Sequence, residues 1–343
     1  MIEQAQKVLD ALRMESGLYL ASSSKDYHFV WIRDTCYAAM ATLWESSGRY
    51  EQTYHALFDI FHRYAWKLEY HMAHRPKEVY EYIHPRYTAD GWEVQEPWGN
   101  AQNDAIGMFL YGVGEGLRRG KTMFRDAADR HIAEMLTDYL RNLEYWHDAD
   151  NGIWEENCEV HVSSVGACAA GLLAMSPFIR VDWDVIVRGL TTVLSYYPRE
   201  SASKGCDLAE LSLIYPYQLL PVDLARHLIA EVEQNLLRSH GTIRYQGDKY
   251  FAKQEKEAEW SMGLPWLGLA CYTVGDMKRA FEYLDWTQRV MTSPGVLPEL
   301  FVGEFHTPNG NTPLAWSQAL YVVLARTLQQ REPVSDKMLA VQS

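Results

Sequence analysis

The sequence has none of the short motifs that identify several common enzyme classes. It contains no Gly-x-Ser-x-Gly, no Walker sequence and no His-Glu-x-x-His, so serine hydrolase, NTPase and zinc protease interpretations have no support. Its five cysteines are scattered and form no Cys-x-x-Cys pair, which is typical of reduced structural thiols. His71 and His74 lie three residues apart, but no acidic or thiol partner stands at ligand spacing. We therefore expect no metal site.

Basic residues are scarce relative to acidic ones. The 343 residues include 32 Lys and Arg against 45 Asp and Glu, a formal net charge of −13, which disfavours a nucleic-acid-binding surface. The longest apolar run, Ala167 to Met175, is less than half of the ~20 residues that span a bilayer, so no membrane association is expected. The first residues lack the basic start and apolar core of a secretory signal, which predicts a cytoplasmic protein.

Helical periodicity dominates the chain, and no series of alternating strands interrupts it. Apolar residues recur every three or four positions, for example at Ile132, Leu136, Tyr139 and Leu143. The pattern predicts helices over residues 2–15, 34–47, 50–68, 103–118, 123–144, 162–175, 182–196, 206–213, 222–238, 259–274, 276–292 and 314–330. No linker-like segment divides them, so we expect one all-α domain over residues 1–343. Twelve helices suit six hairpins closed into an (α/α)6 barrel, and an open superhelical solenoid has the same count.

Four long segments between the predicted helices are rich in aromatic side chains. They are residues 69–102, 145–161, 239–258 and 293–313. Their Trp and Tyr residues, with Gly and Pro as punctuation, indicate ordered loops on one face of the domain. The 12 Trp, 22 Tyr and 10 Phe of the chain suit either a large aromatic core or the walls of a sugar site.

Carboxylates stand among these aromatic loop residues. Glu155 and Glu156 follow Trp154, and Glu299 follows Pro298. Adjacent glutamates are also common at exposed helix starts, where the helix dipole favours them, so each motif alone is ambiguous. A carboxyl group beside Trp is partly removed from water, which favours the protonated form that a general acid needs. With a second carboxylate from a distant loop, this is the arrangement used in glycoside hydrolysis.

Seven short motifs occur in one order along residues 18–330. They are Trp31-Ile32-Arg33-Asp34, Trp98-Gly99-Asn100-Ala101-Gln102-Asn103-Asp104, Trp154-Glu155-Glu156, Arg244-Tyr245, Gly263-Leu264-Pro265-Trp266, Leu297-Pro298-Glu299 and Ala315-Trp316-Ser317. In this order the motifs resemble glycoside hydrolase family 15, the glucoamylase family. That family also includes the hydrolase-like domain of the phosphorylase kinase α and β subunits.

The resemblance implies an (α/α)6 barrel that hydrolyses α-glucosides from the non-reducing end. It also implies inversion at the anomeric carbon, and no metal or organic cofactor. Glu155 takes the position of the general acid, and Glu299 takes that of the general base that activates water. In an inverting enzyme the two carboxyl groups lie roughly 6.5–9.5 Å apart, which leaves room for the attacking water.

The same resemblance assigns eight residues to substrate binding. Arg33 and Asp34 take the positions of a clamp on the hydroxyls of the terminal glucose, Trp98 that of a ring platform and Trp316 that of a pocket wall. The further sugar contacts are Trp31, Trp154, Glu156 and Arg244. From the residues alone, the competing interpretations are a buried structural ion pair for Arg33 and Asp34, and core packing for Trp266 and Trp316.

The expected partner is a small sugar. The chain lacks the N-terminal β-sandwich and the starch-binding module of many family members, which favours short α-glucosides or oligosaccharides of isomaltose type (α-1,6) or of mixed α-1,4 and α-1,6 linkage. The alternative is a non-hydrolytic sugar-binding or regulatory barrel, because residues 159–166 resemble the phosphorylase kinase subunits. Phosphorolysis is a third interpretation, although the sequence has no clear phosphate site. The oligomeric state stays open.

Overall fold

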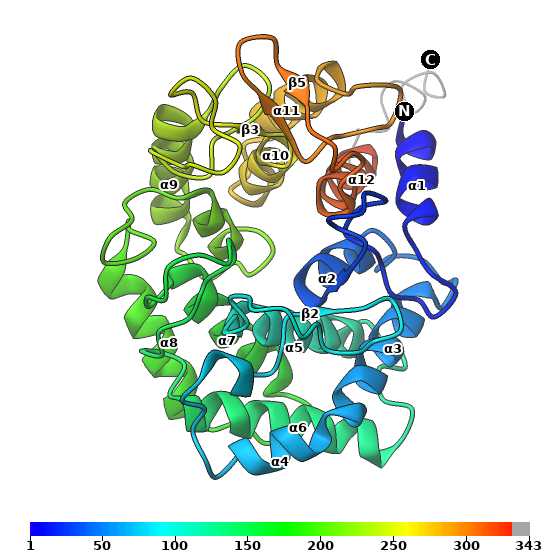
Figure 1. The fold of residues 1–343 in the computed structure, drawn as a ribbon, viewed down its shortest axis with the longest axis vertical. Coiled ribbons are helices and arrows are strands. Elements are labelled where there is room, and N and C mark those ends of the chain that lie inside the picture. Colours follow the sequence, from blue (N-terminus) through cyan, green and yellow to red (C-terminus); the bar gives the residue numbers. More distant parts are fainter. Residues whose placement is uncertain (331–343) are drawn as a thin grey trace, which may run out of the picture.

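In a computed structural model, residues 1–330 form two layers of helices, and successive helices alternate between the outer and the inner layer (Figure 1). Residues 331–343, which belong to the expected single domain, lie outside the described residues. The outer helices are α1 (Ile2–Ala11), α3 (Arg49–Arg63), α6 (Ala127–Leu143), α8 (Trp183–Tyr196), α9 (Val222–Leu236) and α11 (Met277–Arg289). The inner helices are α2 (Ile32–Met40), α5 (Asn103–Arg118), α7 (Val162–Met175), the 3-10 helix η2 (Leu208–Leu213), α10 (Gly263–Thr273) and α12 (Ala315–Gln329).

The inner helices close into a ring. Along the chain α2 contacts α5, α5 contacts α7, α7 contacts η2, η2 contacts α10 and α10 contacts α12. The ring is complete because α12 packs against α2, which joins the two ends of the described chain. An open solenoid has no such contact between its first and last repeats, so the predicted (α/α)6 barrel is confirmed.

Hydrophobic patterning separates the two layers. The outer helix α6 buries one stripe that includes Ile132, Leu136, Tyr139 and Leu143, as the periodicity predicts. The inner helix α7 is buried at nearly every position and consists largely of Ala, Gly, Ser and Val. A helix that is apolar around its whole circumference requires neighbours on every side, and the inner ring supplies them.

Close contact between α5 and α7 depends on glycine. A Cβ atom added at Gly107 would lie 2.3 Å from the backbone carbonyl carbon of Ala167, and one at Gly171 would lie 2.4 Å from the carbonyl oxygen of Gly107. Both distances are below any real Cβ contact, so the two backbones touch where side chains are absent.

Several predicted helices have different boundaries or a different type. The helix predicted over residues 34–47 runs from Ile32 to Met40, and the one predicted over residues 2–15 ends at Ala11. Residues 50–68 contain a break at Tyr64, which separates α3 from α4 (Ala65–His71). Residues 206–213 form a 3-10 helix, in which Asp207 and Glu210 make a capping box. The helix predicted from residue 259 begins at Gly263, because Glu259 and Trp260 instead form strand β3. Pairing with a neighbouring strand overrides the local helical pattern there.

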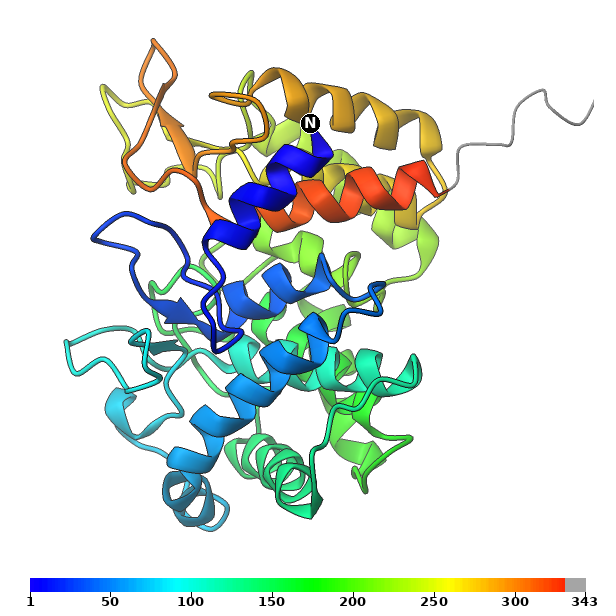
Figure 2. The same cartoon turned by 90° about the vertical axis from the view of Figure 1, so that its right-hand side faces the viewer.

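Short strands order the loops at one end of the barrel. β1 (Val30–Trp31) pairs with β2 (Arg86–Tyr87), and β3 (Glu259–Trp260), β4 (Leu300–Val302) and β5 (Thr307–Pro308) form a second antiparallel sheet. One further 3-10 helix, η1 (Val79–Glu81), lies in the loop before β2. Figure 2 shows these loops gathered on the left of the molecule, opposite the C-terminal end of α12. None of the helices within residues 1–330 is both long and apolar enough to cross a membrane.

The glycine contact between α5 and α7 predicts a large effect of one methyl group. We expect Gly107→Ala to lower the free energy of unfolding by about 1–3 kcal/mol or more, because the inner ring must move apart to admit the new Cβ. Gly205→Ala is the matched control, since no atom lies within 4 Å of its added Cβ. Its unfolding free energy should stay within about 0.5 kcal/mol of wild type. Urea unfolding measures both, and equal stability of the two variants would contradict the packing argument.

Candidate active site

A cavity of about 340 Å³ opens among the ordered loops, at the N-terminal ends of the inner helices. All ten residues that the sequence analysis singled out line this cavity. They are Trp31, Arg33, Asp34, Trp98, Trp154, Glu155, Glu156, Arg244, Glu299 and Trp316. Trp266 does not line it; this indole is fully buried and donates a hydrogen bond to the Tyr215 carbonyl oxygen, which fits core packing.

Glu155 sits in a strained turn between α6 and α7. Its φ is 63° and that of Gly152 is 65°, so both residues adopt the left-handed conformation. A Cβ at Gly152 would also lie 2.8 Å from the ring of His161, which restricts this position to glycine. Non-glycine residues in this conformation cost free energy and cluster at functional sites.

Three side chains surround the Glu155 carboxylate. The indole Nε1 of Trp31 donates to Oε1, and that of Trp98 donates to Oε2 at 2.7 Å. The Arg33 guanidinium lies 3.6 Å from Oε1. The Glu155 side chain is only 13% exposed. Contacts from three distant segments therefore hold this carboxylate at the cavity wall.

Arg33 and Asp34 occupy the first turn of α2, directly after strand β1. The Arg33 guanidinium donates hydrogen bonds to Gln102 and Asp104, and its Nε lies 3.5 Å from the Asp34 carboxylate. Arg33 Nε and Asp34 Oδ1 are both buried without a hydrogen-bond partner. These two atoms face each other as a buried ion pair, and both side chains also line the cavity, where their remaining polar atoms can meet the hydroxyl groups of a ligand.

Burial raises the pKa of Asp34 to about 7. Arg33 lowers this pKa, whereas the negative charges of Glu155 and Asp104 raise it further. The N-terminal position on α2 favours a negative charge through the helix dipole, but it does not offset the loss of water.

Glu156 has a different environment from Glu155. It accepts hydrogen bonds from Arg244 at 2.7 Å, from Lys204 at 2.8 Å and from the Tyr245 hydroxyl at 2.7 Å. Burial alone raises the pKa of Glu156, but the positive charges of Arg244 and Lys204 exceed that effect and the pKa is lowered. Glu156 is therefore an ionised anchor for Arg244, which Asp248 holds from its other side.

Glu299 is the most deeply buried carboxylate of the cavity lining, with 1% of its surface exposed. Asn309 and Asn311 donate side-chain hydrogen bonds to its Oε2, and the backbone N–H of Ser261 donates to its backbone carbonyl. Burial raises the pKa of Glu299, while the hydrogen bonds from Asn311, Asn309 and Tyr27 oppose that shift.

Aromatic rings complete the walls. Trp154 stacks on Trp316 with centroids 6.1 Å apart and leans on Trp260 at 5.6 Å. The indole Nε1 of Trp154 donates to Asp207, which fixes the ring plane. Trp98 is 42% exposed and lies at the rim, with the Arg86 guanidinium 4.2 Å from its centroid. Rings of this kind cover the CH faces of sugars.

The cavity also includes residues that the sequence analysis did not single out. Tyr27, Arg86, Tyr250, Trp260 and Asn311 all line it. The aromatic content of the loops pointed to Tyr250 in general terms only. Arg86 carried no sequence signal, because its place beside Trp31 follows from the pairing of β1 with β2.

Metal-binding geometry lies outside this cavity. Within residues 1–330, the group of His, Cys, Asp and Glu side chains able to hold an ion is His240, Glu259 and His306, none of which lines the cavity. The Nδ1 of His71 instead lies within hydrogen-bond distance of the His74 carbonyl oxygen.

The protein is a helical barrel with a carboxylate-rich, aromatic-walled cavity at one end. Residues 5–181 match the model of Glycosyl hydrolases family 15, and the chain belongs to this family. Its (α/α)6 barrel and glucoamylase-like motifs are those expected from the resemblance.

Two relatives of the chain differ in function. An isomaltose glucohydrolase of Kribbella flavida is 26% identical over 279 residues, which cover 73% of this chain and 70% of that protein. A probable phosphorylase b kinase regulatory subunit alpha of Caenorhabditis elegans is 26% identical over 285 residues, which cover 66% of this chain and 23% of that protein. A glycosidase solved in complex with glucose has the same fold, with a TM-score of 0.83, 22% identity and coverage of 95% of this chain and 96% of that one. Family and relatives support glycoside hydrolase activity on a small sugar.

The raised pKa of Asp34 predicts a pH-dependent effect on stability. The unfolded chain releases this proton near pH 4, whereas the folded protein keeps it to about pH 7. Wild-type stability therefore falls as the pH rises through that window. The difference in unfolding free energy between Asp34→Asn and wild type should therefore favour the variant more at pH 8 than at pH 4. Because the variant also loses an acceptor for a substrate hydroxyl, its kcat/KM for an α-glucoside should fall about 10–100-fold.

Urea unfolding at both pH values measures the first effect. Asp184→Asn is the control, because Asp184 is exposed and its surface ion pair with Arg188 contributes little to stability, so this variant should stay within about 1 kcal/mol of wild type at either pH. A pH-independent difference between Asp34→Asn and wild type would reject the assigned shift.

Proposed function

We propose that this protein is an inverting, exo-acting α-glucosidase that releases β-glucose from the non-reducing end of short α-glucosides. The observation that carries the proposal is the meeting of Glu155 and Glu299 in one cavity, although 144 positions (299 − 155) separate them in the sequence.

The two carboxylates would divide the chemistry. Glu155 would give its proton to the glycosidic oxygen, so that the leaving sugar departs as a neutral alcohol. Glu299 would take a proton from a water molecule, whose oxygen forms the new bond to the anomeric carbon from the opposite face. The product is β-glucose, and the expected carboxyl separation of roughly 6.5–9.5 Å is the space for that water.

The remaining residues would hold the glucose ring. Arg33 and Asp34 would offer a donor and an acceptor to neighbouring hydroxyls, and Arg244, fixed by Glu156, would offer a second charged contact. Trp154 and Trp316 would cover the ring, while Trp31 and Trp98 orient Glu155. A neutral sugar needs this combination because it presents only hydroxyl groups and CH faces.

The substrate we propose is of isomaltose type, with mixed α-1,4 and α-1,6 linkage as the wider range. The isomaltose glucohydrolase of Kribbella flavida supports this choice. We also propose that the whole chain forms one catalytic domain, acts in the cytoplasm and needs no cofactor.

Initial-rate assays with isomaltose, maltose, trehalose and longer oligomers test the substrate and the stereochemistry. We expect isomaltose to have the highest kcat/KM, with little gain from added glucose units because few contacts lie beyond the pocket. Proton NMR of the first turnovers should show β-glucose before mutarotation. Initial α-glucose, or a steep rise in kcat/KM up to soluble starch, would contradict the proposal.

Substitution of each carboxylate by its amide separates acid from base. Glu155→Gln and Glu299→Gln should each lower kcat by at least about 10²–10⁴-fold, since the amide cannot transfer the proton. α-Glucosyl fluoride has a good leaving group, so it should rescue Glu155→Gln much more than Glu299→Gln. Glu282→Gln, on the exposed face of α11, is the control and should match wild type.

The second candidate function is a sugar-binding regulatory barrel without turnover, which the similarity to the Caenorhabditis elegans regulatory subunit favours. Binding of glucose by the wild-type protein, together with no hydrolysis of any α-glucoside in the panel, would establish this alternative. Equal hydrolysis by wild type and both amide variants would instead reject Glu155 and Glu299 as the reacting groups.

A further inference from the structure

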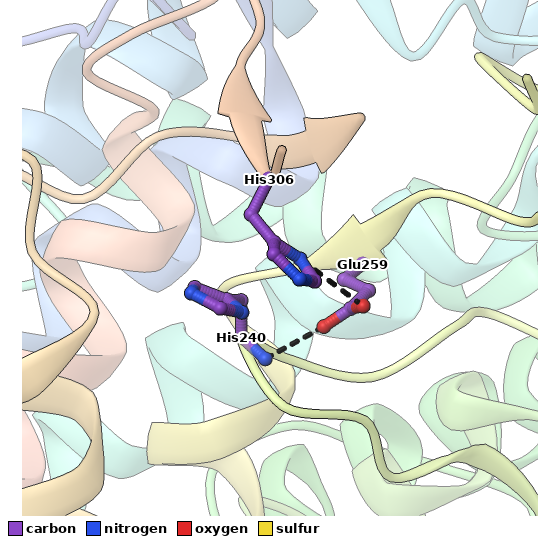
Figure 3. A group of neighbouring side chains, drawn as sticks. All are labelled: His240, Glu259 and His306. Atoms are coloured by element: carbon purple, nitrogen blue, oxygen red, sulfur yellow. Dashed lines mark hydrogen bonds and ion pairs between the residues drawn. The ribbon is translucent and has the colours of Figure 1, made fainter. Parts of the chain in front are cut away.

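Two histidines and a glutamate from three separate segments meet beside the three-stranded sheet (Figure 3). His240 belongs to the loop after α9, Glu259 to strand β3, and His306 to the turn between β4 and β5. Residues 240 and 306 are 66 positions apart (306 − 240), so the tertiary structure alone brings them together.

The three side chains converge closely. Each offers a ligand atom, and these atoms lie within 4.8 Å of one another. The two imidazole rings are stacked, with centroids 3.7 Å apart and an angle of 19° between their planes. In a tetrahedral zinc site with Zn–N distances of about 2.0–2.1 Å, two ligand atoms are about 3.3 Å apart. Because the lone pair of an imidazole nitrogen lies in the ring plane, the two stacked rings would have to turn about their side-chain torsions to aim at one ion.

Two polar atoms of the group make no hydrogen bond and could bind an ion. Oε2 of Glu259 accepts a hydrogen bond from the backbone N–H of His240 at 2.6 Å, which leaves Oε1 as a ligand. Nδ1 of His306 lies 3.5 Å from that Oε1, yet it is buried without a hydrogen-bond partner. Ser239 Oγ lies 2.9 Å from His240 Nδ1, and this contact orients the ring and leaves Nε2 as the ligand atom.

The backbone supports the same arrangement. His306 adopts a left-handed conformation, with a φ of 45°, which is costly for a residue with a side chain. The side chains of His306 and Glu259 are 31% and 15% exposed, so an ion can enter from solvent.

We propose that His240, Glu259 and His306 form a binding site for one zinc ion, with water as the fourth ligand. Two imidazoles and one carboxylate suit Zn²⁺, whereas Ca²⁺ and Mg²⁺ take oxygen ligands. The site lies outside the sugar cavity and is independent of the proposed hydrolysis.

The ion would connect the segments that carry one wall of the cavity. Strand β3 continues from Glu259 into Trp260, which lines the cavity. The β4–β5 hairpin begins directly after Glu299 and ends directly before Asn309, which donates a hydrogen bond to that carboxylate. Zinc would therefore join β3 to the hairpin that flanks Glu299, and would stabilise the folded protein by linkage.

Calorimetric titration of the chelator-treated full chain with zinc chloride tests the site. We expect one Zn²⁺ per chain, and at least about 100-fold weaker binding by His240→Ala and by His306→Ala. His131→Ala, which removes an exposed histidine beside Glu134 on α6, is the matched control, and Cys158→Ser removes an exposed thiol. Both controls should bind zinc as wild type does.

Two further measurements use the wild-type protein and do not depend on enzymatic activity. X-ray absorption of the zinc-loaded wild-type protein should show two imidazole ligands and oxygen, and zinc should raise the thermal unfolding midpoint. Absence of stoichiometric zinc binding by wild type, unchanged affinity in both histidine variants, or a thiolate ligand in the absorption spectrum would each overturn the proposal.

Discussion

The Arg33 guanidinium compensates a cluster of buried negative charges on which the whole site depends. It lies 3.2 Å from Asp104, 3.5 Å from Asp34 and 3.6 Å from Glu155, and all four side chains are largely removed from water. Burial of several carboxylates without a cation is prohibitively costly. Asp34 and Asp104 also occupy first turns of α2 and α5, where the helix dipoles favour negative charge. The parallel orientation of the inner helices is therefore a functional feature as well as an architectural one.

The glutamates of the cavity differ in what surrounds them, and those surroundings define their roles. Cations hold Glu156, indole N–H groups hold Glu155, and neutral amides hold the buried Glu299. Burial raises the pKa of Glu299, whereas for Glu156 the effect of burial is exceeded by Arg244 and Lys204, so that its pKa is lowered. Such divergence among neighbouring carboxyl groups is the usual means of assigning different tasks to one residue type.

The barrel supplies a rigid framework, and its loops supply most of the residues of the cavity. The inner ring packs backbone against backbone at Gly107 and Gly171, which leaves little freedom for its helices to shift. Most of the cavity residues instead come from loops that short strands hold in place, such as Trp31 and Arg86 on β1 and β2. Relatives of this chain include both an isomaltose glucohydrolase and a probable kinase regulatory subunit, so a likeness in sequence and fold does not by itself decide the function.

The sequence by itself determined the all-helical class and most helix positions, and through the family resemblance it indicated ten of the residues that line the cavity. Periodicity reveals the outer stripe of α6, and the continuous apolar run of α7 marks an inner helix, because burial acts on residues close together in the chain. Motif order then identified the site residues, since their chemistry is recognisable in short segments.

Only the tertiary structure decided how the segments meet. Strand pairing converted Glu259 and Trp260 from predicted helix to strand, and it placed Arg86 beside Trp31. The amides around Glu299 and the group of His240, Glu259 and His306 have no local pattern, because their members are neighbours in space and not at any regular spacing. Helices can be predicted from the sequence because their interactions are between residues close together in the chain. Contacts between distant loops cannot, because they depend on the closed ring that carries the loops.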